Sequence, residues 1–253
     1  MRGPEPTIPT VASAAPEPAY EPTWLGRLPA VSVPAKEGDR VWATIPIPGS
    51  EMGSVGIFTV DRIDGPKATI IDKMGQKTRG VPGALVHPLG AEHRPKAGEL
   101  VLCYSWTSAA ALGRTLKAQS RGALVQLDWA GATKVLSVDH TEVPVRGIAP
   151  LAFVAFPKFG RKSKGLVVAV SKSEAWIQAS SGHIEIHPSA TLEPLEIAQD
   201  VSPGNRVAAY SWTNGFEIGT VRRALEPGLR YLVEVGEERV EQPYFFADLI
   251  LQR

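Results

Sequence analysis

GNRVAAYSWTNGFEIGTVRRALEPGLRYLVEV (Gly204–Val235) is one of two similar stretches in the sequence. It aligns without a gap with GELVLCYSWTSAAALGRTLKAQSRGALVQLDW (Gly98–Trp129). The word YSWT stands at the same place in both stretches, and three glycines coincide as well. The alternation of apolar residues is kept where the letters differ. Because self-similarity at a fixed spacing is typical of duplicated units, the chain is predicted to contain two copies of a module of about 50 residues.

The rest of the chain after residue 36 also has the pattern of short strands. Runs rich in Val, Ile and Leu, such as VGIFTVDRI (Val55–Ile63) and GLVVAVS (Gly165–Ser171), alternate with Gly, Pro, Asp and Asn. Turn signals every ~8–12 residues are typical of small barrels and sandwiches. Only Ser108–Ser120 could pass for a helix, and both Gly113 and the second copy contradict that interpretation. The chain is therefore predicted to be all-β.

A weaker internal similarity divides the chain into further units. GALVHPLGA (Gly83–Ala91) and HIEIHPSAT (His183–Thr191) share an aliphatic-His-Pro ending, and each closes a segment that begins with a β run. We therefore expect four small β units in A-B-A-B order, the B units being the duplicated module. The expected bounds are residues 37–95, 96–146, 147–200 and 201–253.

Residues 1–36 are rich in Pro and Ala, which predicts a disordered arm with a polyproline bias. Within it Trp24 and Leu25 are expected to dock on the folded body, the alternative being a partner. The N-terminus lacks the apolar core of a signal peptide, which favours a soluble cytoplasmic protein. The arm also resembles the tether that follows a removed lipoprotein signal, and a start further upstream would change the expected compartment.

Composition narrows the classes of function. The formal net charge of +1 argues against a partner that is a bulk polyelectrolyte. The single cysteine, Cys103, excludes an intramolecular disulfide, and its apolar surroundings predict a buried, inert thiol. No apolar run approaches the ~20 residues of a spanning helix. The motifs of hydrolases, nucleotide-binding enzymes and zinc proteases are missing, so we expect neither catalysis nor a cofactor.

The duplicated module resembles a known family. GNRVAAYSWTNGFEIGTV (Gly204–Val221), the terminal ADLI (Ala247–Ile250) and EGDRVWAT (Glu37–Thr44) are similar to the Tudor/Agenet-type SH3-like barrel. The resemblance implies tandem SH3/Tudor-like barrels behind the arm. It also implies a cage for methylated lysine or arginine, held by cation–π attraction. The cage residues would be Tyr210, Trp212, Phe216 and one of Tyr244, Phe245 or Phe246.

This sequence departs from the family pattern where an aromatic is expected before the second strand, because Glu217 and Ile218 stand there. The first copy has SAAALG in the same place. The alternative role for the aromatics is packing between barrels, since a unit of ~50 residues buries too little surface to be stable alone. One aromatic ring adds roughly 150–250 Å² of buried area. The recurrence of YSWT favours this packing role.

Two further stretches suggest sites. PKFGRKSKG (Pro157–Gly165) could contact nucleic acid or an acidic partner, through phosphate contacts and a stacked aromatic, or be a solvated hairpin. HIEIHP places three candidate metal ligands on one strand face, although the outer pair would lie ~13 Å apart.

We expect a binding or scaffolding protein with a protein or peptide partner, the alternative being nucleic acid. The residues concerned are Lys158, Phe159, Arg161, Lys162 and Lys164 in the basic loop and His183, Glu185 and His187 in the metal candidate.

Overall fold

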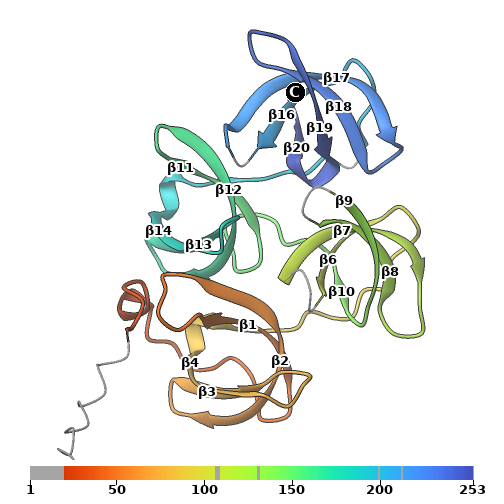
Figure 1. Cartoon of the computed structure of the whole chain (residues 1–253). Coiled ribbons are helices and arrows are strands. Elements are labelled where there is room, and N and C mark those ends of the chain that lie inside the picture. The colour runs from red at the N-terminus through yellow and green to blue at the C-terminus, as the bar shows by residue number, and fades with distance from the viewer. Residues whose placement is uncertain (1–19, 106–108, 130–131, 199, 212, 253) are drawn as a thin grey trace, which may run out of the picture.

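The computed structural model describes residues 20–105, 109–129, 132–198, 200–211 and 213–252. The described residues form four antiparallel sheets of five strands each, with short 3₁₀ turns between strands (Figure 1). The predicted all-β class is confirmed. Within this part of the chain, no helix is long and apolar enough to cross a bilayer.

The sheets follow one another along the chain. Sheet 1 contains β1 (Arg40–Pro46), β2 (Gly53–Asp64), β3 (Lys67–Ile71), β4 (Lys77–Pro82) and β5 (Val86–Pro88). Sheet 2 contains β6 (Leu100–Ser105), β7 (Ala109–Ala118), β8 (Ala123–Trp129), β9 (Ala132–Val138) and β10 (Thr141–Glu142).

Sheet 3 contains β11 (Phe153–Lys158), β12 (Arg161–Val170), β13 (Glu174–Ala179), β14 (Ile184–Pro188) and β15 (Glu193–Pro194). Sheet 4 contains β16 (Arg206–Ser211), β17 (Gly215–Glu226), β18 (Arg230–Val235), β19 (Val240–Phe245) and β20 (Leu249–Leu251). The 3₁₀ turns are η1 (Leu25–Arg27), η2 (Gly83–Leu85), η3 (Ser189–Thr191) and η4 (Phe246–Asp248).

All four sheets share one strand order. Four consecutive strands form a meander, and the fifth returns to pair with the first. The duplicated stretches also pair in the same register, because Tyr104 faces Ala110 in sheet 2 and Tyr210 faces Phe216 in sheet 4. The stretch that could have passed for a helix is strand β7.

Each sheet bends at the same place. The second strand shifts register against the third by a bulge at Val60/Arg62, Thr115/Lys117, Val167/Ala169 and Val221/Arg223. In sheets 2, 3 and 4 a glycine precedes the bulge by two positions. A Cβ on Gly113 would lie 2.2 Å from Val125 Cγ1, and one on Gly219 would lie 2.6 Å from the Glu234 carbonyl. The bend thus brings two strands too close for a side chain, which explains the repeated glycine.

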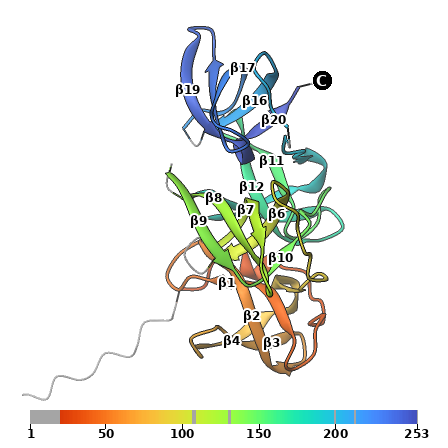
Figure 2. The same cartoon turned by 90° about the vertical axis from the view of Figure 1, so that its right-hand side faces the viewer.

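The four sheets pack into one body. Sheet 1 and sheet 4 lie at opposite ends, with sheets 2 and 3 between them (Figures 1 and 2). One buried apolar cluster includes side chains from all four sheets, among them Trp42, Leu102, Trp176 and Phe246. The sheets therefore stabilise one another through shared apolar contacts.

The single cysteine, Cys103, is fully buried inside sheet 2, and burial raises the pKa of its thiol to about 12.

The arm is ordered from residue 20 onward, so the prediction of disorder over residues 1–36 is wrong for residues 20–36. Trp24 is 1% exposed, and its carbonyl accepts a hydrogen bond of 3.2 Å from Trp176 Nε1. Leu25 packs against the same apolar cluster. The expected docking of Trp24 and Leu25 on the folded body is confirmed, because burial of two large side chains offsets the entropy of ordering the arm. Residues 1–19 lie outside the described residues.

Candidate functional site

The hairpin between β11 and β12 has an unusual tip. Lys158 pairs with Arg161, which leaves Phe159 and Gly160 as a two-residue turn with φ of 49° and 75°. Positive φ at both residues suits the twist of a hairpin and is usually supplied by Asn, Asp or Gly. A phenylalanine there costs on the order of 1 kcal/mol in backbone strain. Phe159 is also 94% exposed, with the Lys158 ammonium 5.9 Å from its ring centroid, so its side chain contributes little packing in return.

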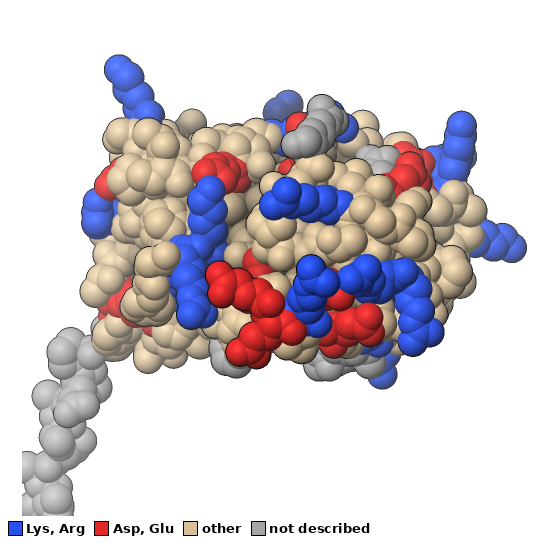
Figure 3. All heavy atoms as spheres, turned by 90° about the horizontal axis from the view of Figure 1, so that it is seen from above, with Lys and Arg blue, Asp and Glu red and all other residues tan. Residues whose placement is uncertain are grey.

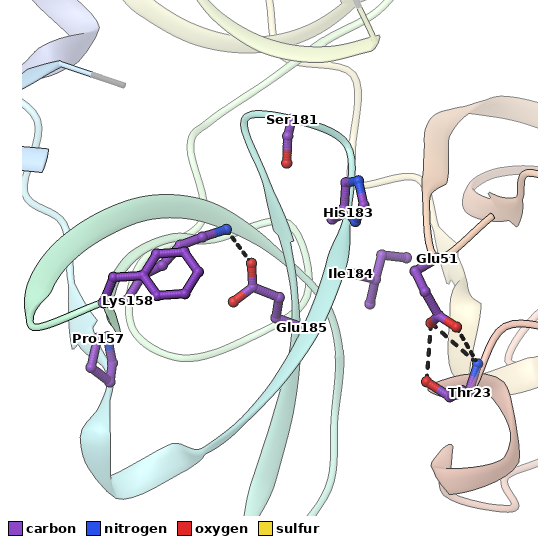
Figure 4. Close-up of a pocket in the computed structure, with 9 residues that line it drawn as sticks. Thr23, Glu51, Pro157, Lys158, Ser181, His183, Ile184 and Glu185 are labelled. Carbon is purple, nitrogen blue, oxygen red and sulfur yellow. Dashed lines mark hydrogen bonds and ion pairs between the residues drawn. The ribbon is translucent and has the colours of Figure 1, made fainter. Parts of the chain in front are cut away.

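Two hollows flank this tip and share Lys158, Phe159 and Ser181 as lining residues. The first hollow, of about 750 Å³, opens toward sheet 1 and the arm. Glu51 and Thr23 lie on one side of it, and Lys158 and Glu185 lie on the other (Figure 4). The second hollow, of about 400 Å³, opens toward sheet 4, whose Tyr210, Thr213 and Gly215 line it.

The carboxylates of the first hollow already have partners within the chain. Glu51 accepts hydrogen bonds from the Tyr20 hydroxyl and from the Thr23 backbone N–H at 2.9 Å. These two donors hold the pKa of Glu51 below its usual value, because both favour the ionised form. Glu185 forms an ion pair with Lys158 (Figure 4). The carboxylates that border the first hollow therefore already have partners within the chain.

The candidate metal ligands do not converge. His187 Nε2 lies 3.4 Å from Glu185 Oε2, and the His187 ring packs against Phe156 at 4.9 Å between centroids. His183 lines the first hollow instead. Among the residues that the structure describes, no group of three His, Cys, Asp or Glu side chains could hold a metal ion.

The basic loop places most of its residues in the second hollow. Lys158, Phe159, Arg161 and Lys162 line it, whereas Lys164 points to sheet 4. The three lysines each have a carboxylate partner, because Lys158 pairs with Glu185, Lys162 with Glu193 at 2.5 Å and Lys164 with Asp248 at 2.5 Å. Arg161 donates to the Thr213 carbonyl at 3.5 Å, near the limit of a hydrogen bond.

The aromatic candidates are only partly brought together. The rings of Tyr210 and Phe216 lie 5.1 Å apart, and Tyr210 is 7% exposed. Tyr244 and Phe245 are buried, and Phe245 lines a separate hollow of about 190 Å³. Trp212 lies outside the described residues. The described aromatics thus do not border one common pocket.

Tyr210 is held by its neighbours in sheet 3. Its hydroxyl lies 3.2 Å from Ser163 Oγ and 3.4 Å from Ser180 Oγ. The Lys164 ammonium lies 5.6 Å from the centroid of its ring and 5.9 Å from that of Phe153. The cation–π position over Tyr210 is therefore occupied by a lysine of the same chain. The expected packing of this tyrosine on a neighbouring unit is confirmed.

Sequence reasoning missed the hydroxyl groups of the second hollow, which are Ser163, Ser180, Ser181 and Thr213. They come from different sheets, and no local pattern marks them. It also missed the contribution of Glu51 and the arm to the first hollow. One signal was available: the dipeptide Phe159-Gly160 between two pairing runs indicates a two-residue turn with an aromatic at its tip.

No model of a known protein family matches the chain, and no curated protein matches it. A structure that aligns with it is that of the four MBT repeats of Drosophila melanogaster Sfmbt in complex with the peptide RHR(me)KVLR. That alignment covers 92% of this chain and 95% of the other, at 10% identity and a TM-score of 0.18. A score this low does not establish a common fold, so the Tudor/Agenet resemblance stays a prediction.

Proposed function

We propose that this chain is a non-enzymatic binding protein, built from tandem SH3/Tudor-like barrels, that holds a peptide segment of a protein partner across the β11–β12 tip. Two features support the barrel interpretation of each sheet. The first strand pairs on both sides, with the second and the fifth strands. The repeated bulge in the second strand bends each sheet, as closure into a barrel requires.

The observation that carries the proposal is the conformation of Phe159. Its backbone has a φ of 49° and its ring is 94% exposed. Both properties destabilise the free protein, and the Lys158 ammonium, 5.9 Å from the ring centroid, leaves almost all of the ring exposed to solvent. A partner that covers the ring would supply the missing burial, and aromatic residues and arginine are both enriched at protein interfaces. Strain retained at an exposed position is accordingly interpreted as a binding feature.

A protein partner fits the charges better than nucleic acid does. The three lysines of the basic loop are paired with carboxylates, which lowers the number of cations available to phosphates. On the face of the molecule seen in Figure 3, Lys and Arg side chains lie beside Asp and Glu side chains. The nucleic-acid alternative predicts salt-sensitive binding of oligonucleotides, lost when Lys158, Arg161 and Lys162 are replaced by alanine.

A methyl-lysine cage at Tyr210 is less favoured than a packing role for that residue. The Lys164 ammonium already lies over its ring, and Phe216 and the serines of sheet 3 cover the rest of the side chain. A bound methylammonium would have to displace Lys164 from Asp248 as well. We therefore assign the recognition surface to the hairpin tip and the tyrosine to the contact between sheets.

The test is selection of binders from a random peptide library, followed by fluorescence anisotropy with the selected peptides. Phe159→Asn removes the ring and relieves the strained φ, so we expect affinity to fall by about tenfold or more while the free energy of unfolding rises by roughly 0.5–1 kcal/mol. Arg239→Asn is the matched control, because Arg239 is an exposed residue with a φ of 53° in another turn.

We expect Arg239→Asn to give a similar gain in stability and no change in affinity. Peptides that bind Phe159→Asn as tightly as the wild type would contradict the proposal. A failure to select any peptide would contradict it as well.

A further inference from the structure

We propose, resting on the function above, that the second hollow binds an oxyanion of the partner peptide, a phosphate or a carboxylate, through Arg161 and the surrounding hydroxyl groups. The chemistry of the lining residues supports this choice. Arg161, Ser163, Ser180, Tyr210 and Thr213 all supply groups able to donate hydrogen bonds. An oxyanion accepts several such bonds at once, which makes it the complementary ligand.

Arg161 differs from the other cations of the loop. Its guanidinium makes one long contact of 3.5 Å, to the Thr213 carbonyl, whereas Lys158, Lys162 and Lys164 each have a carboxylate partner. A guanidinium carries five N–H donors in a planar fork, so most of its capacity is left for a ligand. Arginine also loses less solvation than lysine when an oxyanion covers it.

The hydroxyl groups form a cluster built from two sheets. Tyr210 of sheet 4 points its hydroxyl at Ser163 and Ser180 of sheet 3, at 3.2 and 3.4 Å. The tyrosine has one hydroxyl proton, so it can donate to one of the two serines, and that serine can then turn its own proton toward a ligand. The cluster therefore offers donors without bringing a negative charge of its own, so it does not repel an anion.

The wall of the hollow is held in a defined position. Gly215, the first residue of β17 in sheet 4, approaches β12 so closely that a Cβ would lie 2.4 Å from the Lys162 carbonyl. The two sheets are thus in backbone contact beside the cluster, and the ligand meets a preformed surface. A volume of about 400 Å³ accommodates a phosphorylated or acidic side chain with its neighbouring backbone.

The experiment uses the full chain and four degenerate peptide libraries that differ only in one fixed central residue: phosphoserine, glutamate, serine or glutamine. Binding is measured by fluorescence anisotropy for the wild type, Arg161→Ala and Arg161→Lys. Arg79→Ala is the control, because Arg79 is an exposed strand residue that lines neither hollow. Circular dichroism checks that each variant keeps its fold.

We expect the phosphoserine or glutamate library to bind at least about tenfold more tightly than its neutral counterpart. Arg161→Ala should abolish that preference, Arg161→Lys should retain part of it, and Arg79→Ala should leave it intact. A stronger response to phosphoserine identifies the phosphate as the source of the oxyanion, and an equal response identifies any carboxylate or phosphate.

Equal binding of charged and neutral libraries would overturn the inference, and so would a preference that survives Arg161→Ala. If binding in those cases still depended on Phe159, the hairpin-tip function would stand while the oxyanion site fell. If no library bound and an oligonucleotide bound through Arg161, both proposals would be overturned in favour of nucleic acid.

Discussion

The contact between sheets 1 and 2 and the contact between sheets 3 and 4 join equivalent partners with different chemistry. In both, the tyrosine of the YSWT word faces the preceding sheet. Tyr104 meets Trp42 edge-on at 6.1 Å between ring centroids, and Tyr210 meets Ser163, Ser180 and Lys164. The tyrosine of the repeated word therefore contacts the preceding sheet in both stretches, although the surface that it contacts differs.

The two contacts also use a carboxylate in different ways. At the first contact, Glu142 is 7% exposed and accepts from Trp42 Nε1 at 2.9 Å, from His140 at 2.7 Å and from the Gly90 N–H at 3.0 Å. At the second, Asp248 pairs with Lys164, whose ammonium also donates to the Ala247 carbonyl at 2.9 Å.

The difference teaches that two pairs of consecutive sheets with the same strand order can be held together by different interactions. The first contact depends on a deeply buried hydrogen-bonded acid, and the second on a partly exposed ion pair with aromatic neighbours. Buried hydrogen-bonded charges are far more costly to disrupt than exposed ion pairs. The first contact should therefore be the stronger of the two.

The largest effect is expected for Glu142→Ala. The change leaves the buried Trp42 indole N–H and the buried His140 ring without their carboxylate partner, so the free energy of unfolding should fall by roughly 3–5 kcal/mol. Urea titration measures the fall. Glu193→Ala is the control, because the side chains of Glu193 and of its partner Lys162 are both more than half exposed. This variant should change the free energy of unfolding by no more than about 0.5 kcal/mol. Equal losses in the two variants would remove the distinction between buried and exposed acids.

Lys164→Ala should destabilise the second contact by about 1–2 kcal/mol, because its ammonium is only partly exposed and binds both Asp248 and the Ala247 carbonyl. Lys164→Met keeps the aliphatic stem against Phe153 and Tyr210, so it should recover part of the loss. Thermal and urea unfolding of both variants, with Lys162→Ala as the exposed control, give the comparison. A loss as large as that of Glu142→Ala would contradict the ranking of the two contacts.

Acid should weaken the first contact. Burial on its own favours the neutral acid, but hydrogen bonds from His140 and Trp42 and the charge of His140 together hold the pKa of Glu142 below its usual 4.5. Its carboxylate therefore contributes stability that is fully present above that value and is lost as pH falls through the lower pKa of the folded state. Unfolding free energies measured from pH 5.5 to pH 3 should show a drop that Glu142→Gln reduces. An identical drop in the variant would assign the acid sensitivity elsewhere.

The smallest effect concerns the two tyrosine hydroxyls. Tyr210→Phe removes the contacts to Ser163 and Ser180 and should cost about 0.5–1.5 kcal/mol. Tyr104→Phe should cost close to nothing, because its hydroxyl has no hydrogen-bond partner among the described residues. Matched urea titrations of the two variants provide the measurement, and a reversed order would mean that the hydroxyl of Tyr104, rather than that of Tyr210, contributes more to stability.

Strand positions and the duplication were predictable because they depend on local signals. The aligned YSWT words, the glycines before the bulges and the short aliphatic runs all follow from the geometry of one strand and its neighbour. Gly113 and Gly219, for example, coincide in the sequence and also at the bends of the two sheets. Such features need no knowledge of distant parts of the chain.

The contacts between sheets could not be predicted in this way. Glu142 reaches a tryptophan 100 positions away, and the indole of Trp176 donates to the arm 152 positions away. The ion pairs of the basic loop could not be predicted either, because the carboxylate partners of its lysines, among them Glu193 and Asp248, lie outside the loop in the sequence. No periodicity in the sequence indicates which surfaces of two units meet.

The buried state of Cys103 makes the molecule convenient for spectroscopy. With a thiol pKa of about 12 and no exposed surface, this residue supplies almost no thiolate at neutral pH. A dye attached through Phe159→Cys would therefore label the hairpin tip alone, without removal of the native cysteine. The labelled protein could report occupancy of either hollow as a change in emission.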